Sequence, residues 1–117
     1  MVTLTDVQLD IVKRFKELRK NYMENVRKIK NVAKRIFDNR FVAVYVFGSV
    51  ISGKTHPMSD VDVAIILSEE VCEEERIKLY KEVRKMFGLH PFEIHILTVN
   101  EWEKWYRKFV KDNFIKI

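Results

Sequence analysis

Four residues between positions 48 and 62 have types and a spacing that could carry phosphate and metal chemistry. The segment FGSVISGKTHPMSDVDVAIIL (47–67) holds Gly48 and Ser49, followed by two aspartates, Asp60 and Asp62, with one residue between them. The whole chain contains only three glycines, and two of them lie in this segment. Glycine costs conformational entropy unless its freedom is needed, and aspartate is depleted in strands. Folding alone therefore does not explain these residues.

The two aspartates are predicted to form part of a metal site. Alternate side chains of a strand share a face, so Asp60 and Asp62 would point the same way with Cα atoms about 7 Å apart. Carboxylates this close repel each other unless a cation lies between them, and Mg²⁺ or Mn²⁺ prefers such oxygen ligands. If the next predicted strand is a neighbour, Glu93 completes a three-carboxylate site, with His95 on the same face in a supporting role. Three carboxylates around two divalent ions describe a two-metal phosphoryl-transfer centre.

The Gly-Ser turn is predicted to bind phosphate. A strand that ends in Gly48-Ser49 and turns into a short helix leaves backbone N–H groups that bind anions. Gly48 has no Cβ, so a triphosphate can approach the backbone closely. The Ser49 hydroxyl and the Lys54 ammonium would add contacts. Ser59 is assigned to the same nucleotide site, where it would brace the loop that presents Asp60.

A long helix is predicted before these residues. Apolar residues recur at steps of three and four along residues 5–38, with Thr5 and Gln8 as a capping box. A helix of this length would span about 50 Å, which exceeds the size of a small domain. It therefore either breaks near Asn21–Asn25 or projects to meet a partner.

Strands and helices are predicted to alternate in the rest of the chain. β-branched and aromatic runs predict strands at 41–47, 60–67 and 92–98. A short turn or helix is predicted at 49–55, ended by His56-Pro57. Helices are predicted at 69–87, ended by Gly88, and from a cap at Asn100 to about Lys111. The helix between the last two strands favours a parallel pair. The predicted fold class is α/β (α+β), with a small mixed β-sheet flanked by helices.

Composition limits the class of protein. A chain of 117 residues with 47% hydrophobic residues suits one domain, 1–117, with an N-terminal helical segment at 1–38 and a catalytic core at 39–113. No apolar run is long enough for a membrane span, and the single cysteine, Cys72, fits a reducing compartment, so a cytoplasmic protein is expected. Abundant Lys, Arg and Glu beside one glutamine is typical of thermophiles. The net charge of +5 favours anionic partners, although a well-solvated surface explains it equally well. Nucleic acid could bind the basic face of the first helix, but that face lacks aromatic platforms and a recognition-helix pattern and is interpreted as solvated.

The spacing of the chemical residues resembles that of a known family. Gly48-Ser49, ten residues and then Asp60-Val61-Asp62 match the GSx10DxD signature of the DNA polymerase β nucleotidyltransferase superfamily. The chain is most similar to the short minimal nucleotidyltransferases (MNT type) of prokaryotes. The resemblance implies the nucleotidyltransferase fold and a Mg²⁺-dependent transfer of a nucleoside monophosphate, expected to be AMP from ATP, to a hydroxyl group with release of pyrophosphate.

The resemblance also implies a role for each matching residue. Asp60 and Asp62 would bind two Mg²⁺ ions, Glu93 would stand where the family has its third acid, and Gly48 and Ser49 would hold the β- and γ-phosphates. The chain departs from the family pattern in two ways. The third acid is commonly aspartate rather than glutamate. Many members carry an arginine after Gly-Ser where this chain has Val50-Ile51, which leaves Lys54 or His56 to neutralise the phosphates.

The sequence alone does not determine which partner the protein binds or which acceptor it modifies. Minimal members of the family often act as antitoxins of small helical HEPN-type toxins, which they adenylylate on tyrosine, so a HEPN partner is implied. The alternatives are a non-catalytic module that binds and inhibits a partner, and a transferase that acts on RNA or a small molecule. A homo-oligomer is also an alternative. The aromatic stripe at the end of the chain is predicted to pack in the core, with a partner interface as its alternative: Trp102, Trp105, Tyr106 and Phe109.

Overall fold

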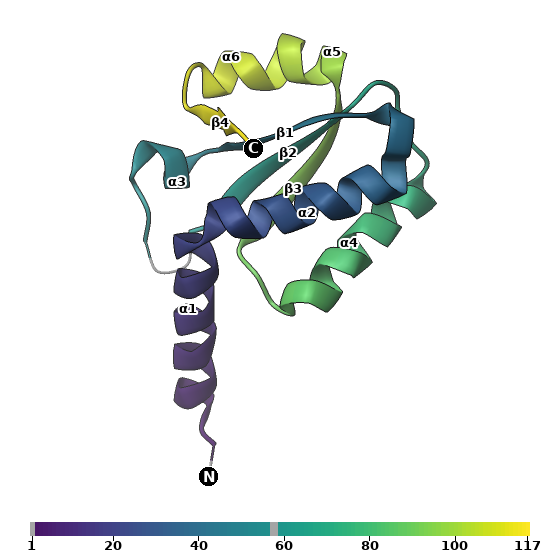
Figure 1. The fold of residues 1–117 in the computed structure, drawn as a ribbon. Helices are drawn as coiled ribbons and strands as arrows, with labels where there is room; N and C mark the ends of the chain where they lie inside the picture. Colours follow the sequence, from purple (N-terminus) through teal and green to yellow (C-terminus); the bar gives the residue numbers. More distant parts are fainter. Residues whose placement is uncertain (1, 57–58) are drawn as a thin grey trace.

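The computed structural model describes residues 2–56 and 59–117, and its centre is a four-stranded mixed sheet (Figure 1). Pro57, which was predicted to end the short helical segment, lies outside the described residues. The strand order is β3-β2-β1-β4, with β2 and β3 parallel and β1 antiparallel to both β2 and β4. The strands are β1 (Phe41–Phe47), β2 (Val61–Leu67), β3 (Phe92–Thr98) and β4 (Phe114–Lys116). The mixed sheet and the parallel pair confirm the prediction, whereas β4 was not predicted.

The two faces of β2 pack against different layers, and this decides where the site lies. Val61 and Val63 belong to a core cluster that also includes Ile29 of α2 and Leu79 of α4. The intervening residues Ala64 and Ile66 face a second cluster, which contains Trp102 and Val110. Figure 1 shows α2 and α4 on one side of the sheet and the C-terminal helices on the other. Because side chains alternate along a strand, Asp62 lies on the face toward the C-terminal helices.

The predicted N-terminal helix is divided at Asn21 into α1 (Leu4–Lys20) and α2 (Tyr22–Phe37). The helix α2 packs in the core, whereas none of the described residues of α1 is buried, and α1 extends away from the body (Figure 1). The predicted cap is wrong: Thr3 and Asp6, not Thr5 and Gln8, form the capping box. The Asp6 carboxylate accepts a hydrogen bond of 3.1 Å from the Thr3 backbone N–H, and a charged acceptor of this kind is stronger than the neutral amide that Gln8 would offer to Thr5.

The segment predicted at 49–55 starts as predicted but its helix ends at residue 52, and the helix predicted at 69–87 starts only at residue 73. The helices are α3 (Ser49–Ser52), α4 (Glu73–Phe87), α5 (Val99–Glu101), a π-helical turn (Trp102–Tyr106) and α6 (Arg107–Val110), and a 3₁₀ turn (Asp38–Arg40) follows α2. Gly88 ends α4 with a φ of 68°, as predicted. The cap of α5 is Thr98, paired with Glu101 in a capping box, rather than Asn100. Within the described part of the chain, no helix combines the length and the apolar character that crossing a bilayer requires.

Candidate functional site

Two carboxylates and one imidazole meet on the face of the sheet that is turned toward the C-terminal helices. Asp62 on β2 and Glu93 on β3 are direct neighbours in the parallel register, and His95 follows two residues after Glu93. One ligand atom from each of the three side chains lies within 4.8 Å of the others. The His95 Nε2 atom is 3.4 Å from Asp62 Oδ1 and 3.9 Å from Glu93 Oε1. The structure thus brings Asp62 and Glu93 together as predicted, and it places His95 within ion-pair distance of Asp62, which agrees with a supporting role.

Asp60 lies outside this cluster. It lies one residue before β2 begins, and the side chains whose ligand atoms meet within 4.8 Å are those of Asp62, Glu93 and His95. Asp60 is exposed, and it is close enough for its negative charge to contribute to a raised pKa of Glu93. A metal site with three carboxylates therefore remains a prediction, whereas the pair formed by Asp62 and Glu93 is part of the fold.

The repulsion between the two carboxylates of the cluster would be reduced by a bound cation. Burial, followed by the hydrogen bond and the negative charge of Asp62, raises the pKa of Glu93 above its ordinary value. Two acidic groups in this position repel each other when both are ionised. Carboxylate oxygens are the preferred ligands of Mg²⁺ and Mn²⁺, so the donor set fits a hard divalent ion.

Gly48 is required by the position of Asp62. Its φ of 86° lies in the region that favours glycine, and a Cβ atom there would be 2.2 Å from Asp62 Oδ2. The antiparallel register pairs Phe47 with Asp62, which brings the carboxylate against the next residue, Gly48. The Gly48 carbonyl accepts hydrogen bonds from the N–H groups of Ile51 and Ser52 and so starts α3. The close approach of Asp62 therefore explains why residue 48 is glycine, which strand propensity does not explain.

A cavity of about 390 Å³ adjoins the acidic cluster. Its volume is within the range of small-ligand sites. Gly48, Ser52 and Asp62 line one side, and Tyr106 and Phe109 line another. A larger hollow of about 720 Å³ lies over α4, but its walls belong to that helix alone and include none of the predicted site residues.

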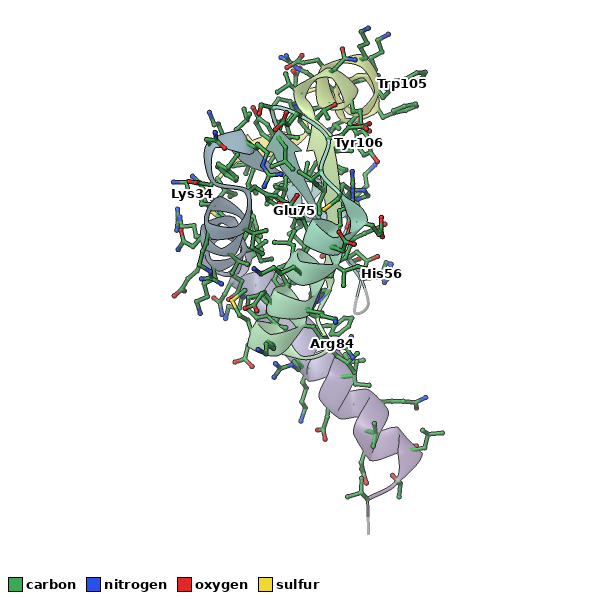
Figure 2. The ribbon with its side chains drawn as sticks, turned by 90° about the vertical axis from the view of Figure 1, so that its right-hand side faces the viewer. Lys34, His56, Glu75, Arg84, Trp105 and Tyr106 are labelled. Carbon is green, nitrogen blue, oxygen red and sulfur yellow. The ribbon has the colours of Figure 1, made fainter. Side chains whose placement is uncertain are left out.

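The C-terminal aromatic residues divide between core and surface. Trp102 is 2% exposed and stacks on Tyr45, which confirms the core prediction for this residue. Trp105 and Phe109 are 63% and 83% exposed, so the core prediction is wrong for both. Figure 2 shows Trp105 on the outer side of its helix, whereas Tyr106 lies between the helix and the sheet.

Tyr106 links the aromatic helix to the acidic cluster, a role that the sequence analysis missed. Its hydroxyl lies 3.5 Å from His95 Nδ1, and its ring contacts Phe47. Because the other nitrogen of His95 faces Asp62, the imidazole is held between a phenol and a carboxylate. The sequence signal that could have indicated this role is the spacing of the aromatic residues that follow β3.

The remaining predicted residues lie around the α3 loop. Ser49 is the first residue of α3, and Lys54 is exposed just after the helix. Ser59 is 4% exposed, and its hydroxyl accepts a hydrogen bond of 2.7 Å from the backbone N–H of His56. This geometry favours the bracing role of Ser59, and its contact with a nucleotide remains a prediction.

Replacing Glu93 by glutamine is expected to raise the melting temperature at pH 7 when divalent ions are chelated. The folded protein raises the pKa of Glu93, so this group favours the folded state below its ordinary pKa of 4.5. That contribution is lost as the pH rises through the raised pKa. A neutral amide avoids the loss, so a small increase in melting temperature is expected.

Thermal denaturation in EDTA at pH 7 and pH 4 measures this effect, and the difference between wild type and variant should shrink at pH 4. Glu70→Gln, at an exposed position, controls for the change in net charge. A variant that melts below wild type at pH 7 would contradict the raised pKa.

Comparison with known proteins agrees with this geometry. Residues 27–115, well over half of the chain, match the family model "Polymerase beta, Nucleotidyltransferase". The spectinomycin 9-adenylyltransferase of Enterococcus faecalis is 26% identical over 92 residues, which are 73% of this chain and 36% of that protein. The chain spans about a third of the length of the curated relatives it matches.

Solved structures share the fold. One, provisionally described as a nucleotidyltransferase, has a TM-score of 0.61 and 28% identity, with 79% of this chain and 96% of that chain covered. Another contains a tri-AMPylated HEPN toxin of Shewanella oneidensis in complex with its MNT antitoxin. It has a TM-score of 0.53 and 14% identity, and covers 80% of this chain and 69% of that chain. Because the family model covers residues 27–115, the chain belongs to the polymerase β nucleotidyltransferase family.

Proposed function

We propose that the chain transfers a nucleoside monophosphate, AMP from ATP, to a hydroxyl group with the help of divalent metal ions and with release of pyrophosphate. The observation that carries this proposal is the placement of Asp62. This carboxylate neighbours Glu93 in the register, occupies the space left by Gly48, and lines the cavity of about 390 Å³. A nucleotide in that cavity would therefore have its phosphates beside the acidic pair.

In such a transfer, some residues of the site would bind metal ions and others would bind the phosphates of the nucleotide. Asp62 and Glu93, with Asp60 as the predicted third acid, would hold two Mg²⁺ or Mn²⁺ ions. Bound there, the ions would polarise the α-phosphate and stabilise the charge on the leaving pyrophosphate. Backbone N–H groups at Gly48 and Ser49 would hold the β- and γ-phosphates.

Several side chains would assist without binding metal. Lys54 and His56 are proposed to neutralise phosphate charge, and Ser59 to hold the loop that carries Asp60. His95 would act as a positioning residue, because it contacts Asp62 on one side and Tyr106 on the other.

Phe109 is proposed to stack on the nucleobase. It is 83% exposed and lines the cavity that Gly48 and Asp62 also line. Phe109→Ala is expected to weaken ATP binding about tenfold without changing stability, since a base that stacks on an aromatic ring gains about 1–3 kcal/mol. Isothermal titration with ATP and Mg²⁺ measures the change.

Trp105→Ala is the matched control for this prediction. Trp105 is exposed on the same helical stretch but is not among the cavity residues, so ATP binding should be unchanged. Equal losses in the two variants would contradict a direct contact of Phe109 with the base.

The acceptor is proposed to be a tyrosine hydroxyl of a small helical HEPN-type protein. The fold is shared with an MNT antitoxin whose partner toxin is AMPylated. The exposed rings of Trp105 and Phe109 beside the site offer a surface for such a partner. The second candidate is a small-molecule hydroxyl, which is favoured by the 26% identity to a spectinomycin 9-adenylyltransferase.

Two measurements test the proposed function. Calorimetric titration of the four nucleoside triphosphates, with and without Mg²⁺, should show metal-dependent binding of ATP that is lost in the Asp60→Asn, Asp62→Asn double variant. Transfer of label from α-labelled ATP to a HEPN protein, to RNA and to spectinomycin then identifies the acceptor. The absence of nucleotide binding, and of transfer to each acceptor, would refute the proposal.

A further inference from the structure

A second cavity, of about 360 Å³, lies where α1 meets α2 and the loop after α3. Its residues come from parts of the chain that are distant in sequence: the end of α1, the first residue of α2, and residues 50–55. We call it the α1 corner, and its polar and turn residues are Lys16, Arg19, Lys20, Tyr22, Gly53 and Thr55. The lining includes three cationic side chains and no acidic one. Such a cavity is suited to an anion.

The three cations of the α1 corner are available to a ligand. Among the described residues, Lys16 and Lys20 are exposed and form no ion pair within 4.0 Å. Arg19 donates one hydrogen bond, from Nη1 to the Ser59 carbonyl at 3.2 Å. This bond ties α1 to the loop before β2 and leaves the other N–H donors of the guanidinium for a ligand.

The positive charge extends beyond the α1 corner along both N-terminal helices. Residues 4–37 contain ten Lys and Arg against four Asp and Glu, a net charge of +6. The other residues contain twelve against thirteen, a net charge of −1. The excess of positive charge on the chain is therefore confined to α1 and α2. This distribution favours a ligand with several negative charges in a row over a single small anion.

The α1 corner is distinct from the acidic site but adjoins the same short helix. Gly48 and Ser52 line the cavity beside Asp62, whereas Val50 and Gly53 line the α1 corner. The one-turn helix α3 therefore forms part of both walls. Lys16, Arg19 and Lys20 precede the residues that match the family model, 27–115, so likeness to the family does not supply this site.

We propose that the α1 corner binds a phosphate group of a nucleic-acid strand, whose neighbouring phosphates follow the basic surfaces of α1 and α2. Lysine and arginine that contact phosphates supply sequence-independent affinity and release counterions, so binding weakens as salt rises. A strand held in the α1 corner would lie beside α3, which also contributes Ser52 to the cavity next to Asp62. From the sequence alone, the basic face of the predicted N-terminal helix was interpreted as solvated; the observation that favours a bound strand is the cavity lined by Lys16, Arg19 and Lys20.

The test is fluorescence anisotropy of a short labelled single-stranded RNA of mixed sequence, titrated with protein in EDTA over a series of salt concentrations. EDTA removes any contribution of the metal site, so failure here is separate from failure of the proposed transfer. Lys16→Gln, Lys20→Gln is expected to weaken binding about tenfold and to reduce the slope of log affinity against log salt by about 1.4, or about 0.7 for each lost contact. Arg19 is left unchanged because it also holds the loop.

The matched control is Lys78→Gln, Lys81→Gln, which makes the same change in charge at exposed positions on α4 and should retain wild-type affinity. Equal losses in both double variants would show general attraction and overturn the site. Absence of RNA binding at low salt would also overturn it. If inorganic tripolyphosphate binds in the α1 corner and RNA does not, the proposal of a nucleic-acid strand is overturned, and the ligand of the site is a free polyphosphate.

Discussion

Asp62→Asn is expected to lower the rate of nucleotide transfer by about 10³-fold or more while the chain stays folded. Asparagine keeps the shape of the side chain, and hence its fit against Gly48, but removes the charge that would hold a divalent ion. It also relieves the repulsion that helps to raise the pKa of Glu93, so stability should not fall. Steady-state transfer of labelled AMP, with melting curves on the same samples, measures both quantities.

Two further aspartate variants make this result interpretable. Asp10→Asn changes the same charge on the exposed α1 helix and should leave the rate unchanged. Asp60→Asn asks whether the residue that precedes β2 binds metal: a loss as large as that of Asp62→Asn would support the three-carboxylate site. If Asp62→Asn keeps a rate within tenfold of wild type, the acidic pair has no part in the reaction.

Local sequence predicted the two strands β1 and β3 correctly because turn residues mark where each strand ends. The runs 41–47 and 92–98 match β1 and β3 residue for residue, since β-branched and aromatic residues fill them and turns bound them. The helix starts were harder to predict. Thr3 with Asp6 and Thr5 with Gln8 have the same capping pattern, and only one of them begins α1. The strand β4 has three residues and exists through its pairing with β1, so no periodicity could reveal it.

The candidate site was predictable to the extent that it depends on strand neighbours. A parallel pair of strands was enough to place Glu93 beside Asp62. The contact of Asp62 with Gly48 depends on the antiparallel register and on one backbone angle, neither of which the sequence displays. The part played by Tyr106 depends on how the π-helical turn packs against the sheet, where the Tyr106 ring contacts Phe47 and His95. Sequence therefore predicted that Asp62 and Glu93 are neighbours, and tertiary structure added the groups that contact Asp62.

Gly48→Ala is expected to reduce the transfer rate about 100-fold, because a misplacement of about 1 Å at a reacting centre is enough for such a loss. A Cβ atom at this position would lie 2.2 Å from Asp62 Oδ2, so the carboxylate must move. The backbone, with φ of 86° and ψ of −153°, also disfavours alanine and should cost about 1–3 kcal/mol of stability. Transfer rates at saturating ATP, together with denaturant unfolding, separate the two effects.

Gly53→Ala separates backbone strain from displacement of the carboxylate. Gly53 also has a positive φ, 78°, but a Cβ atom there would meet nothing within 4 Å. This variant should lose stability, because left-handed backbone is unfavourable for alanine, yet it should keep its transfer rate. If both variants lose stability and only Gly48→Ala loses activity, the glycine of the Gly-Ser turn is needed to make room for Asp62. If both lose activity equally, the shape of the α3 turn matters more than the position of Asp62.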